Sequence, residues 1–196
     1  MTVIKFATAT VFAVFIAACS SAPVEHFYTL EPIAATASAV GKTGPAVSIG
    51  PVTLPEAVDR AQMVVRVGSN QVLQVEERRW AETLRFAIPR VVSSDIGRYL
   101  PGATVSVRAD SAVEPQAKYR VAIDVLRFDS RLADGITLEA RWRIQGGGTA
   151  VQSGTATITE PANGGGYEDL AAAHGRALAG ISQQISSAIR GMEGSR

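Results

Sequence analysis

The chain has 196 residues, of which 46% are hydrophobic and 19% charged, and its 19 Lys and Arg against 18 Asp and Glu leave a formal charge of +1. This size suits one domain with tails, and the apolar content excludes wholesale disorder. The balanced charge gives no electrostatic reason to expect a nucleic-acid partner, because phosphate binding requires clustered positive charge. With a single cysteine, the chain also lacks an internal disulfide and a Cys-rich zinc site.

The first element in chain order is an apolar segment. Residues 6–18 carry no charge and follow Lys5. This stretch is too short to cross a bilayer as a helix, which takes about 20 residues, but it fits the hydrophobic region of a secretory signal. Residues 1–18 are therefore predicted to be a signal peptide, cleaved between Ala18 and Cys19.

The end of this segment, Ile16-Ala17-Ala18-Cys19, resembles the bacterial lipobox, which usually has Leu in place of Ile16. The resemblance implies that the Cys19 thiol takes a thioether-linked diacylglycerol, so that this covalent lipid is expected and no other cofactor. Each buried CH₂ contributes about 0.8 kcal/mol, and two or three acyl chains anchor a protein stably. Ser20 rather than Asp follows the cysteine, as in lipoproteins passed on to the outer membrane. The alternative is a plain secretory signal with Cys19 near its cleavage site.

The start of the mature chain is rich in Ala, Ser, Thr and Pro. Residues 20–25 are expected to form a flexible tether, 27–30 a short strand and 31–44 a low-complexity loop. Residues 19–45 would thus be a lipidated N-terminus ahead of a single folded domain, for which we expect the bounds 46–191.

A strand from Val47 is expected to end at Gly50-Pro51, ahead of a second breaker at Leu54-Pro55. Two β-branched runs, 61–67 and 71–76, then flank a three-residue connection with Gly and Asn. Because both residue types tolerate positive φ, this pattern predicts a hairpin.

A helix is predicted over about 79–100. Trp80, Leu84, Ile88, Val91 and Ile96 recur there at steps of three to five residues, which is typical of a helix with one apolar face. The charged run that ends at Arg79 is interpreted as the helix start. A proline inside this segment is expected to kink or split the helix.

Four strands are predicted next, at 104–107, 118–128, 136–144 and 149–160. The run 136–144 alternates strictly between apolar and polar residues, which indicates a sheet with one buried face, the antiparallel pattern. A long amphipathic helix over about 167–190 follows, and residues 192–196 are expected to be a tail. The predicted fold class is α+β, a mostly antiparallel sheet with two main helices packed on one face.

Chemistry-bearing residues are few. His26 lies at a predicted strand edge and His174 on the apolar stripe of the last helix, so both are interpreted as structural, and no catalytic or metal site is predicted. The segment from Leu54 to Arg66 is more suggestive, because Asp59, Arg60 and Arg66 lie there among apolar residues. We expect these three residues to form a binding edge for a partner protein; the alternative is an ordinary loop with a local Asp–Arg pair.

Several short motifs, spread over most of the mature chain, resemble one family in their order and spacing. They are Phe27-Tyr28-Thr29-Leu30, Ile49-Gly50-Pro51-Val52 with Leu54-Pro55, Asp59-Arg60 with Met63-Val64-Val65-Arg66, Arg79-Trp80-Ala81-Glu82-Thr83-Leu84, and Tyr167-Glu168 with Ala171-Ala172-Ala173-His174 and Arg176-Ala177-Leu178. The family is that of the ABC-type transport auxiliary lipoproteins, which includes the paraquat-inducible C subunit. The chain departs from it at Thr83, where Pro is common, and at Ala61-Gln62, where Pro-Gln is common.

The resemblance implies a non-enzymatic lipoprotein at the periplasmic face of the outer membrane. Its partners would be a periplasmic mammalian-cell-entry (MCE) domain protein and an inner-membrane transporter, together moving lipid across the periplasm. Self-association of several copies of the chain into a ring is a further alternative that the sequence does not decide. Two rival interpretations are a pilot lipoprotein that helps assemble another envelope complex and a small envelope hydrolase, although no nucleophile–base arrangement supports the latter.

Overall fold

The computed structural model describes residues 23–33, 44–107, 117–146 and 149–194. The predicted signal peptide, Cys19 and parts of the predicted tether and loop lie outside these residues. The elements are β1 (His26–Tyr28), β2 (Ala46–Thr53), β3 (Gln62–Arg66), β4 (Val72–Trp80), α2 (Leu84–Tyr99), β5 (Thr104–Val107), β6 (Tyr119–Arg131), β7 (Gly135–Gln145), β8 (Val151–Pro161) and α3 (Tyr167–Gly194). The predicted α+β class is confirmed.

The strands form two sheets rather than the single sheet expected. A three-stranded sheet has the order β1-β4-β3 and a five-stranded sheet the order β5-β2-β6-β7-β8. The hairpin β3–β4 and the meander β6–β7–β8 are antiparallel as predicted. However, β1 pairs with β4, and β2 with both β5 and β6, in parallel, so both sheets are mixed. This difference arises because β2 inserts between strands that follow it much later in the chain.

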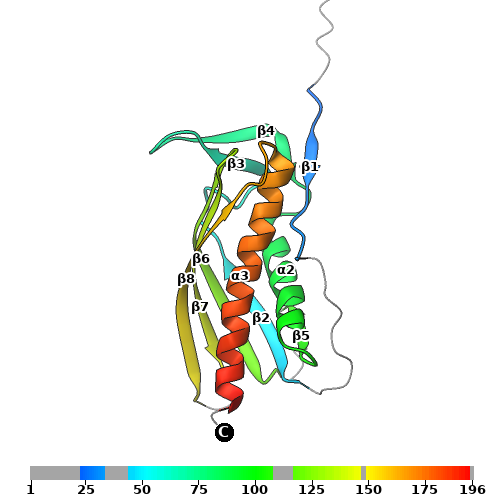
Figure 1. The fold of residues 1–196 in the computed structure, drawn as a ribbon, viewed down its shortest axis with the longest axis vertical. Helices are drawn as coiled ribbons and strands as arrows, with labels where there is room; N and C mark the ends of the chain where they lie inside the picture. Colours follow the sequence, from blue (N-terminus) through cyan, green and yellow to red (C-terminus); the bar gives the residue numbers. More distant parts are fainter. Residues whose placement is uncertain (1–22, 34–43, 108–116, 147–148, 195–196) are drawn as a thin grey trace, which may run out of the picture.

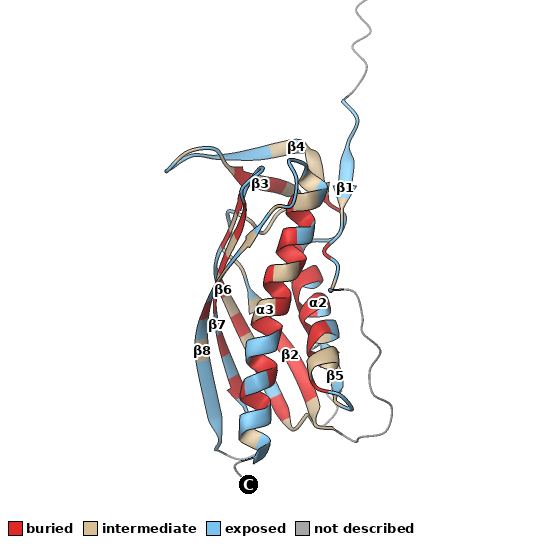
Figure 2. Ribbon diagram, in the orientation of Figure 1, coloured by how far each residue is buried: buried red, intermediate tan, exposed pale blue. Residues whose placement is uncertain are grey.

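Both helices cover the same face of the five-stranded sheet, as predicted (Figure 1). α3 lies along β7 and β8, and α2 packs against β2, β5 and α3. Figure 2 shows that the buried residues gather between the helices and the sheet. The described chain begins at the end of the molecule that holds β1 and β4, and α3 ends at the opposite end, two residues short of the C-terminus.

The residue alternation along β7 decides which face the helices cover. Its apolar residues are buried, namely Ile136, Leu138, Ala140, Trp142 and Ile144. Arg141 and Arg143 lie between them and are exposed. Because successive side chains of a strand point to opposite faces, the apolar set packs under the helices and the arginines face away.

The predicted helix over 79–100 begins later than expected, which is a correction to the sequence analysis. Residues up to Trp80 belong to β4, and α2 starts at Leu84 after the N-cap residue Thr83. The reason is a long-range pairing, since Phe27 and Tyr28 of β1 lie beside Arg79 and Trp80. The charged run before Trp80 is therefore strand and not a helix start.

Two smaller differences concern the ends of β2 and α3. β2 does not end at Gly50-Pro51 but continues to Thr53, with a register irregularity between Ile49 and Val52. In α2 there is no such difference: as expected, it is a single element with Pro89 inside it. α3 continues to Gly194, beyond the predicted end near residue 190.

Candidate interaction surface

The face of the five-stranded sheet that the helices leave uncovered, called here the outer face, is polar and positively charged. The strands β6 and β7 place five arginines and three acidic residues on it, an excess of two positive charges. These residues are Arg120, Asp124, Arg127, Asp129, Arg131, Glu139, Arg141 and Arg143. The chain as a whole carries only +1. The outer face is therefore a local concentration of positive charge in a nearly neutral protein.

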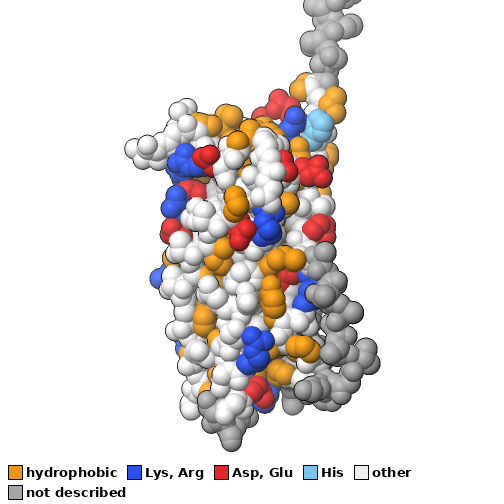
Figure 3. Space-filling view, viewed as in Figure 1, with side chains coloured by type: hydrophobic (Ala, Val, Ile, Leu, Met, Phe, Trp, Pro, Cys, Tyr) orange, Lys and Arg blue, Asp and Glu red, His pale blue; other side chains and the backbone are white. Residues whose placement is uncertain are grey.

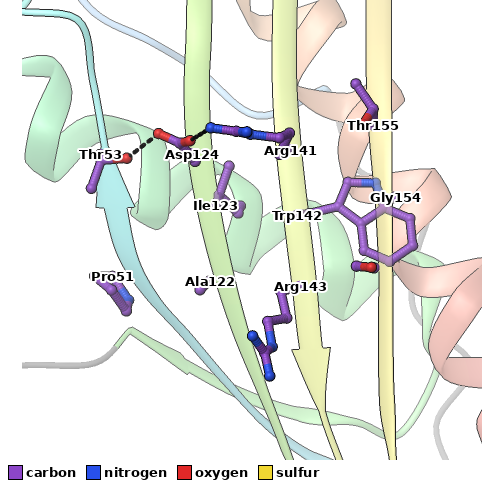
Figure 4. Close-up of a pocket in the computed structure, with 11 residues that line it drawn as sticks. Pro51, Thr53, Ala122, Ile123, Asp124, Arg141, Trp142, Arg143, Gly154 and Thr155 are labelled. Carbon is purple, nitrogen blue, oxygen red and sulfur yellow. Dashed lines mark hydrogen bonds and ion pairs between the residues drawn. The ribbon is translucent and has the colours of Figure 1, made fainter.

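A hollow of about 590 Å³ lies on this face between β2 and β8 (Figure 4). Ala122 lines the hollow, and its short side chain leaves room between the longer side chains around it. Arg143 lies directly across from Ala122 on β7. Thr53 and Asp124 line one side, and Arg141 and Thr155 line the other. The hollow thus combines guanidinium groups and hydroxyls with a small apolar floor.

Hydrogen bonds fix one side of the hollow. The Thr53 hydroxyl donates to Asp124 at 2.6 Å, and Arg141 Nη2 donates to the other oxygen of Asp124 at 2.6 Å. These bonds lower the pKa of Asp124, that from Thr53 most, followed by that from Arg141. Arg143 is exposed and has no ion pair with any other described residue. Its guanidinium is therefore available to an anionic or carbonyl group of a partner.

A second depression, called here the hairpin groove, lies where the three-stranded sheet meets β6. It encloses about 330 Å³ and is lined in part by Pro55, Val58, Val72 and Leu126. Leu126 is exposed because the register of β6 and β7 shifts between Val125 and Arg127. The groove therefore offers apolar contacts beside the charged outer face.

Arg66, one of the three predicted partner-binding residues, lies in this groove. It forms a bidentate ion pair with Asp129, at 2.8 Å from Nε and 2.9 Å from Nη2. Asp129 also accepts from Arg127 at 2.8 Å, and Arg127 pairs with Glu139 at 3.1 Å. The bonds from Arg66, and then from Arg127, hold the pKa of Asp129 below its ordinary value. This network joins the two sheets at the surface.

The other two predicted residues lie apart from Arg66. Asp59 forms an ion pair with Arg85 of α2. Arg60 donates from Nη2 to the Glu56 carbonyl at 3.3 Å, while its Nε is buried with no hydrogen-bond partner among the described residues. The Asp59 carboxylate thus pairs with a residue of α2 and not with an arginine of its own segment.

The two histidines occupy different environments. His26 is exposed on β1, which is an edge strand. His174 is fully buried beside Trp80 and Phe128, with ring centroids 5.4 Å and 4.5 Å away. Its ring nitrogens contact Ser130 Oγ at 2.9 Å and the Leu170 carbonyl at 2.7 Å. Burial lowers the pKa of His174 to about 4. The interpretation of His174 as a helix-packing residue is confirmed.

Two further observations concern the described part of the chain only. Within residues 23–33, 44–107, 117–146 and 149–194, no group of three His, Cys, Asp or Glu side chains is placed to hold a metal ion. None of the helices that the structure describes has the length and apolar character needed to cross a membrane.

Sequence reasoning missed Arg141, Arg143 and Thr53 as site residues. The alternation in β7 puts both arginines on the polar side of a strand, which is a signal available from the sequence. The contribution of Thr53 could not be predicted from the sequence, because it depends on the parallel pairing of β2 with β6. A charged face of a sheet is usually interpreted as solvated surface until the neighbouring strands are known.

The fold is that of a small α+β domain with a charged outer face. The family model of the ABC-type transport auxiliary lipoprotein component matches residues 28–186. The chain therefore belongs to this family of auxiliary transport lipoproteins, which is not an enzyme family. Comparison with curated proteins finds no match.

Solved structures share the fold at low sequence identity. An uncharacterized protein superposes with a TM-score of 0.70 at 14% identity, covering 85% of this chain and 99% of its own. The protein XCC0632 from Xanthomonas campestris, described as DUF330, gives a TM-score of 0.65 at 18% identity, covering 87% of this chain and 99% of its own. These similarities support the fold alone.

Proposed function

We propose that this chain is a non-enzymatic, lipid-anchored component of an MCE- and ABC-type system that moves lipid across the periplasm. The observation that carries the proposal is the family match over residues 28–186. The motifs Ile16-Ala17-Ala18-Cys19 and Ser20 add the expectation of a diacylglycerol on Cys19 and of residence at the periplasmic face of the outer membrane.

The outer face is the proposed docking surface for the periplasmic MCE-domain protein. Its excess of arginine fits an acidic surface on that partner, and oppositely charged surfaces increase the rate of encounter. Arg143 can bind the partner without breaking an internal ion pair among the described residues. The hairpin groove, with Arg66 and the nearby loop that carries Asp59 and Arg60, extends this surface and supplies apolar contacts.

Arg66 is a poor residue with which to test docking, because its guanidinium already joins β3 to Asp129 of β6. A substitution there removes this contact between the two sheets as well as altering the surface. Arg143→Glu is the better variant, and Gln184→Glu on the exposed side of α3 is its matched control. Loss of copurification with the MCE-domain protein is expected for Arg143→Glu and not for Gln184→Glu.

Two measurements test the anchor and the system. The intact mass of the protein from native membranes should lack residues 1–18 and carry acyl chains on Cys19; a bare thiol or a retained leader contradicts the anchor. Crosslinking followed by pulldown should recover an MCE-domain protein and a transporter. Recovery of the subunits of a different envelope complex, with no lipid defect in a deletion strain, would instead favour the pilot role.

Self-association of the chain is a further part of the proposal. A ring of copies at the membrane would give lipid a path through its centre. Native mass spectrometry at concentrations that imitate a membrane surface should then give a closed oligomer, whereas a monomer under these conditions would contradict this part alone.

A further inference from the structure

Exposed apolar side chains lie at two places on the end of the molecule where the described chain begins, one at each end of β4. Phe27 of β1 is 61% exposed, and Val67, Val72 and Leu73 around the β3–β4 turn are 55%, 46% and 52% exposed. Figure 3 shows hydrophobic side chains along the rim over β4 and beside β1. We call this end, defined by Phe27 and residues 67–73, the anchor end. The three turn residues are close together in the hairpin, whereas Phe27 lies beside Arg79 at the other end of β4. Exposed apolar side chains that lie together mark a contact surface.

The β3–β4 turn and the residues on either side of it carry no charge. Residues 67–75 include no Asp, Glu, Lys, Arg or His. The hairpin also projects from the body of the molecule (Figure 1). A charged side chain must be desolvated at a high cost when it enters an apolar phase, whereas this segment carries no such cost. The segment is therefore suited to enter a lipid interface as well as to contact a protein.

The short chain between Cys19 and β1 favours a lipid interface over a protein as the contact of this segment. Phe27 lies eight positions after Cys19 in the sequence. A fully extended chain spans at most about 3.5 Å per residue, so Phe27 lies within about 28 Å of an acylated Cys19. The chain from Pro23 runs away from the body at this same end, and α3 ends at the other (Figure 1). A bilayer that holds the acyl chains is thus within reach of the anchor end.

The polar groups around the anchor end suit the headgroup layer. Arg79 is paired with Glu25 at 2.9 Å, so its charge is compensated within the protein. Arg78 lies over the ring of Tyr167, 5.5 Å from the centroid. Aromatic and arginine side chains with an apolar body and a polar tip are favoured where lipid meets water.

We infer that the anchor end is a second membrane-contacting surface, in which Phe27 and the tip of the β3–β4 hairpin insert into the lipid interface beside the acyl chains. This inference rests on the lipid anchor proposed above. Acyl chains alone leave the domain free to rotate above the membrane. Additional contacts at Phe27 and Leu73 would fix the orientation of the domain, with its long axis pointing away from the bilayer. The outer face would then be presented to the periplasm.

The test uses the full acylated chain in vesicles of phosphatidylethanolamine and phosphatidylglycerol. Phe27→Cys and Leu73→Cys are each labelled with a polarity-sensitive fluorophore, since acylation leaves Cys19 without a free thiol. Val151→Cys is the matched control: it is 49% exposed and pairs with Gln145 at the end of the sheet near Met192 of α3. All three positions are exposed, so the label does not disturb packing.

Lipids that carry a nitroxide near the headgroup should quench the labels at positions 27 and 73 several-fold more than the label at position 151. Equal quenching at all three positions, in a chain that floats with the vesicles and carries lipid on Cys19, overturns the inference and leaves the anchor intact. A blue-shifted emission without quenching indicates cover by protein and overturns it as well. A chain that carries no lipid and does not float contradicts both the inference and the proposed anchor.

Discussion

The two faces of the five-stranded sheet differ in almost every physical respect. The face under the helices is aliphatic and closely packed, with Leu138 and Ile144 fully buried. The outer face carries arginines, threonines and acidic residues, and no described helix covers it (Figure 1). Both faces are built from the same strands, because side chains alternate along β6, β7 and β8.

Because of this difference, stability and binding are expected to depend on different residues of the same strand. Neighbouring residues of β7 belong to different faces, so one substitution should alter folding and the next should alter docking. Surface residues away from special features change stability by about 0.5 kcal/mol or less. The outer face can therefore vary with its partner while the helix face maintains the fold.

The largest expected effect compares Leu138→Ala with Thr137→Ala. Leu138 is fully buried under the helices, and its truncation leaves a cavity that costs about 2–5 kcal/mol of unfolding free energy. Thr137 points to the outer face and should cost about 0.5 kcal/mol or less. Urea denaturation measures both values. Similar losses for the two variants would mean that the faces are not energetically distinct.

The buried His174 should make the unfolding free energy depend on pH. Its pKa is lowered from 6.5 to about 4 in the folded protein, chiefly by burial. Below pH 6.5 the unfolded chain binds a proton that the folded chain does not, so stability is complete above that pH and falls as the pH drops towards 4. The slope is at most about 1.4 kcal/mol per pH unit, and the total loss about 3 kcal/mol.

The variant His174→Gln should remove this part of the pH dependence. The comparison with the unaltered chain isolates His174 from the acidic groups, which titrate in both proteins. His26→Gln is the control, because His26 is exposed on β1. Unfolding free energies that stay parallel with pH for the unaltered chain and His174→Gln would contradict the prediction.

Gly154 provides a comparison within β8. A Cβ at this position would lie 2.4 Å from the Trp142 ring, which packs over the glycine from the opposite strand position. Gly154→Ala must displace the buried indole and should cost about 1–3 kcal/mol. Thr155→Ala, one residue along and on the outer face, should be nearly neutral. Near-ultraviolet circular dichroism of the tryptophans would report the displacement directly.

A smaller effect is expected at the junction of the two sheets. Arg66→Ala removes the bidentate pair with Asp129, which is partly exposed, so the loss of stability should be small and should shrink in high salt. Arg131→Ala, which has no ion pair with the described residues, is the control. Equal thermal midpoints for the two variants would show that the network does not stabilise the junction.

Local patterns in the sequence predicted much of this fold. Alternation at 136–144 predicted β7 and its buried side, and the periodicity from Leu84 to Ile96 predicted α2. Errors occur where a distant strand decides the outcome. Trp80 lies in β4 because it pairs with Tyr28, and β2 lies beside β6, more than 60 residues later.

The candidate surface shows the same limit. Segment 54–66 was predicted as a binding edge because charges lie among its apolar residues, yet Arg66 pairs with Asp129 across 63 positions and Asp59 pairs with Arg85 across 26. Such partners depend on tertiary packing, which periodicity does not encode. The alternation of arginines along β7, in contrast, was visible locally.

We propose that the outer face, and not the exposed side of α3, docks the periplasmic partner. A photoreactive amino acid placed at Thr155 on the outer face, or at Gln184 on the exposed side of α3, tests it in intact cells. The account predicts crosslinks to the MCE-domain protein from position 155 that are lost in Arg143→Glu, and none from position 184. Crosslinks from position 184 alone, or from position 155 regardless of the charge at position 143, would contradict it.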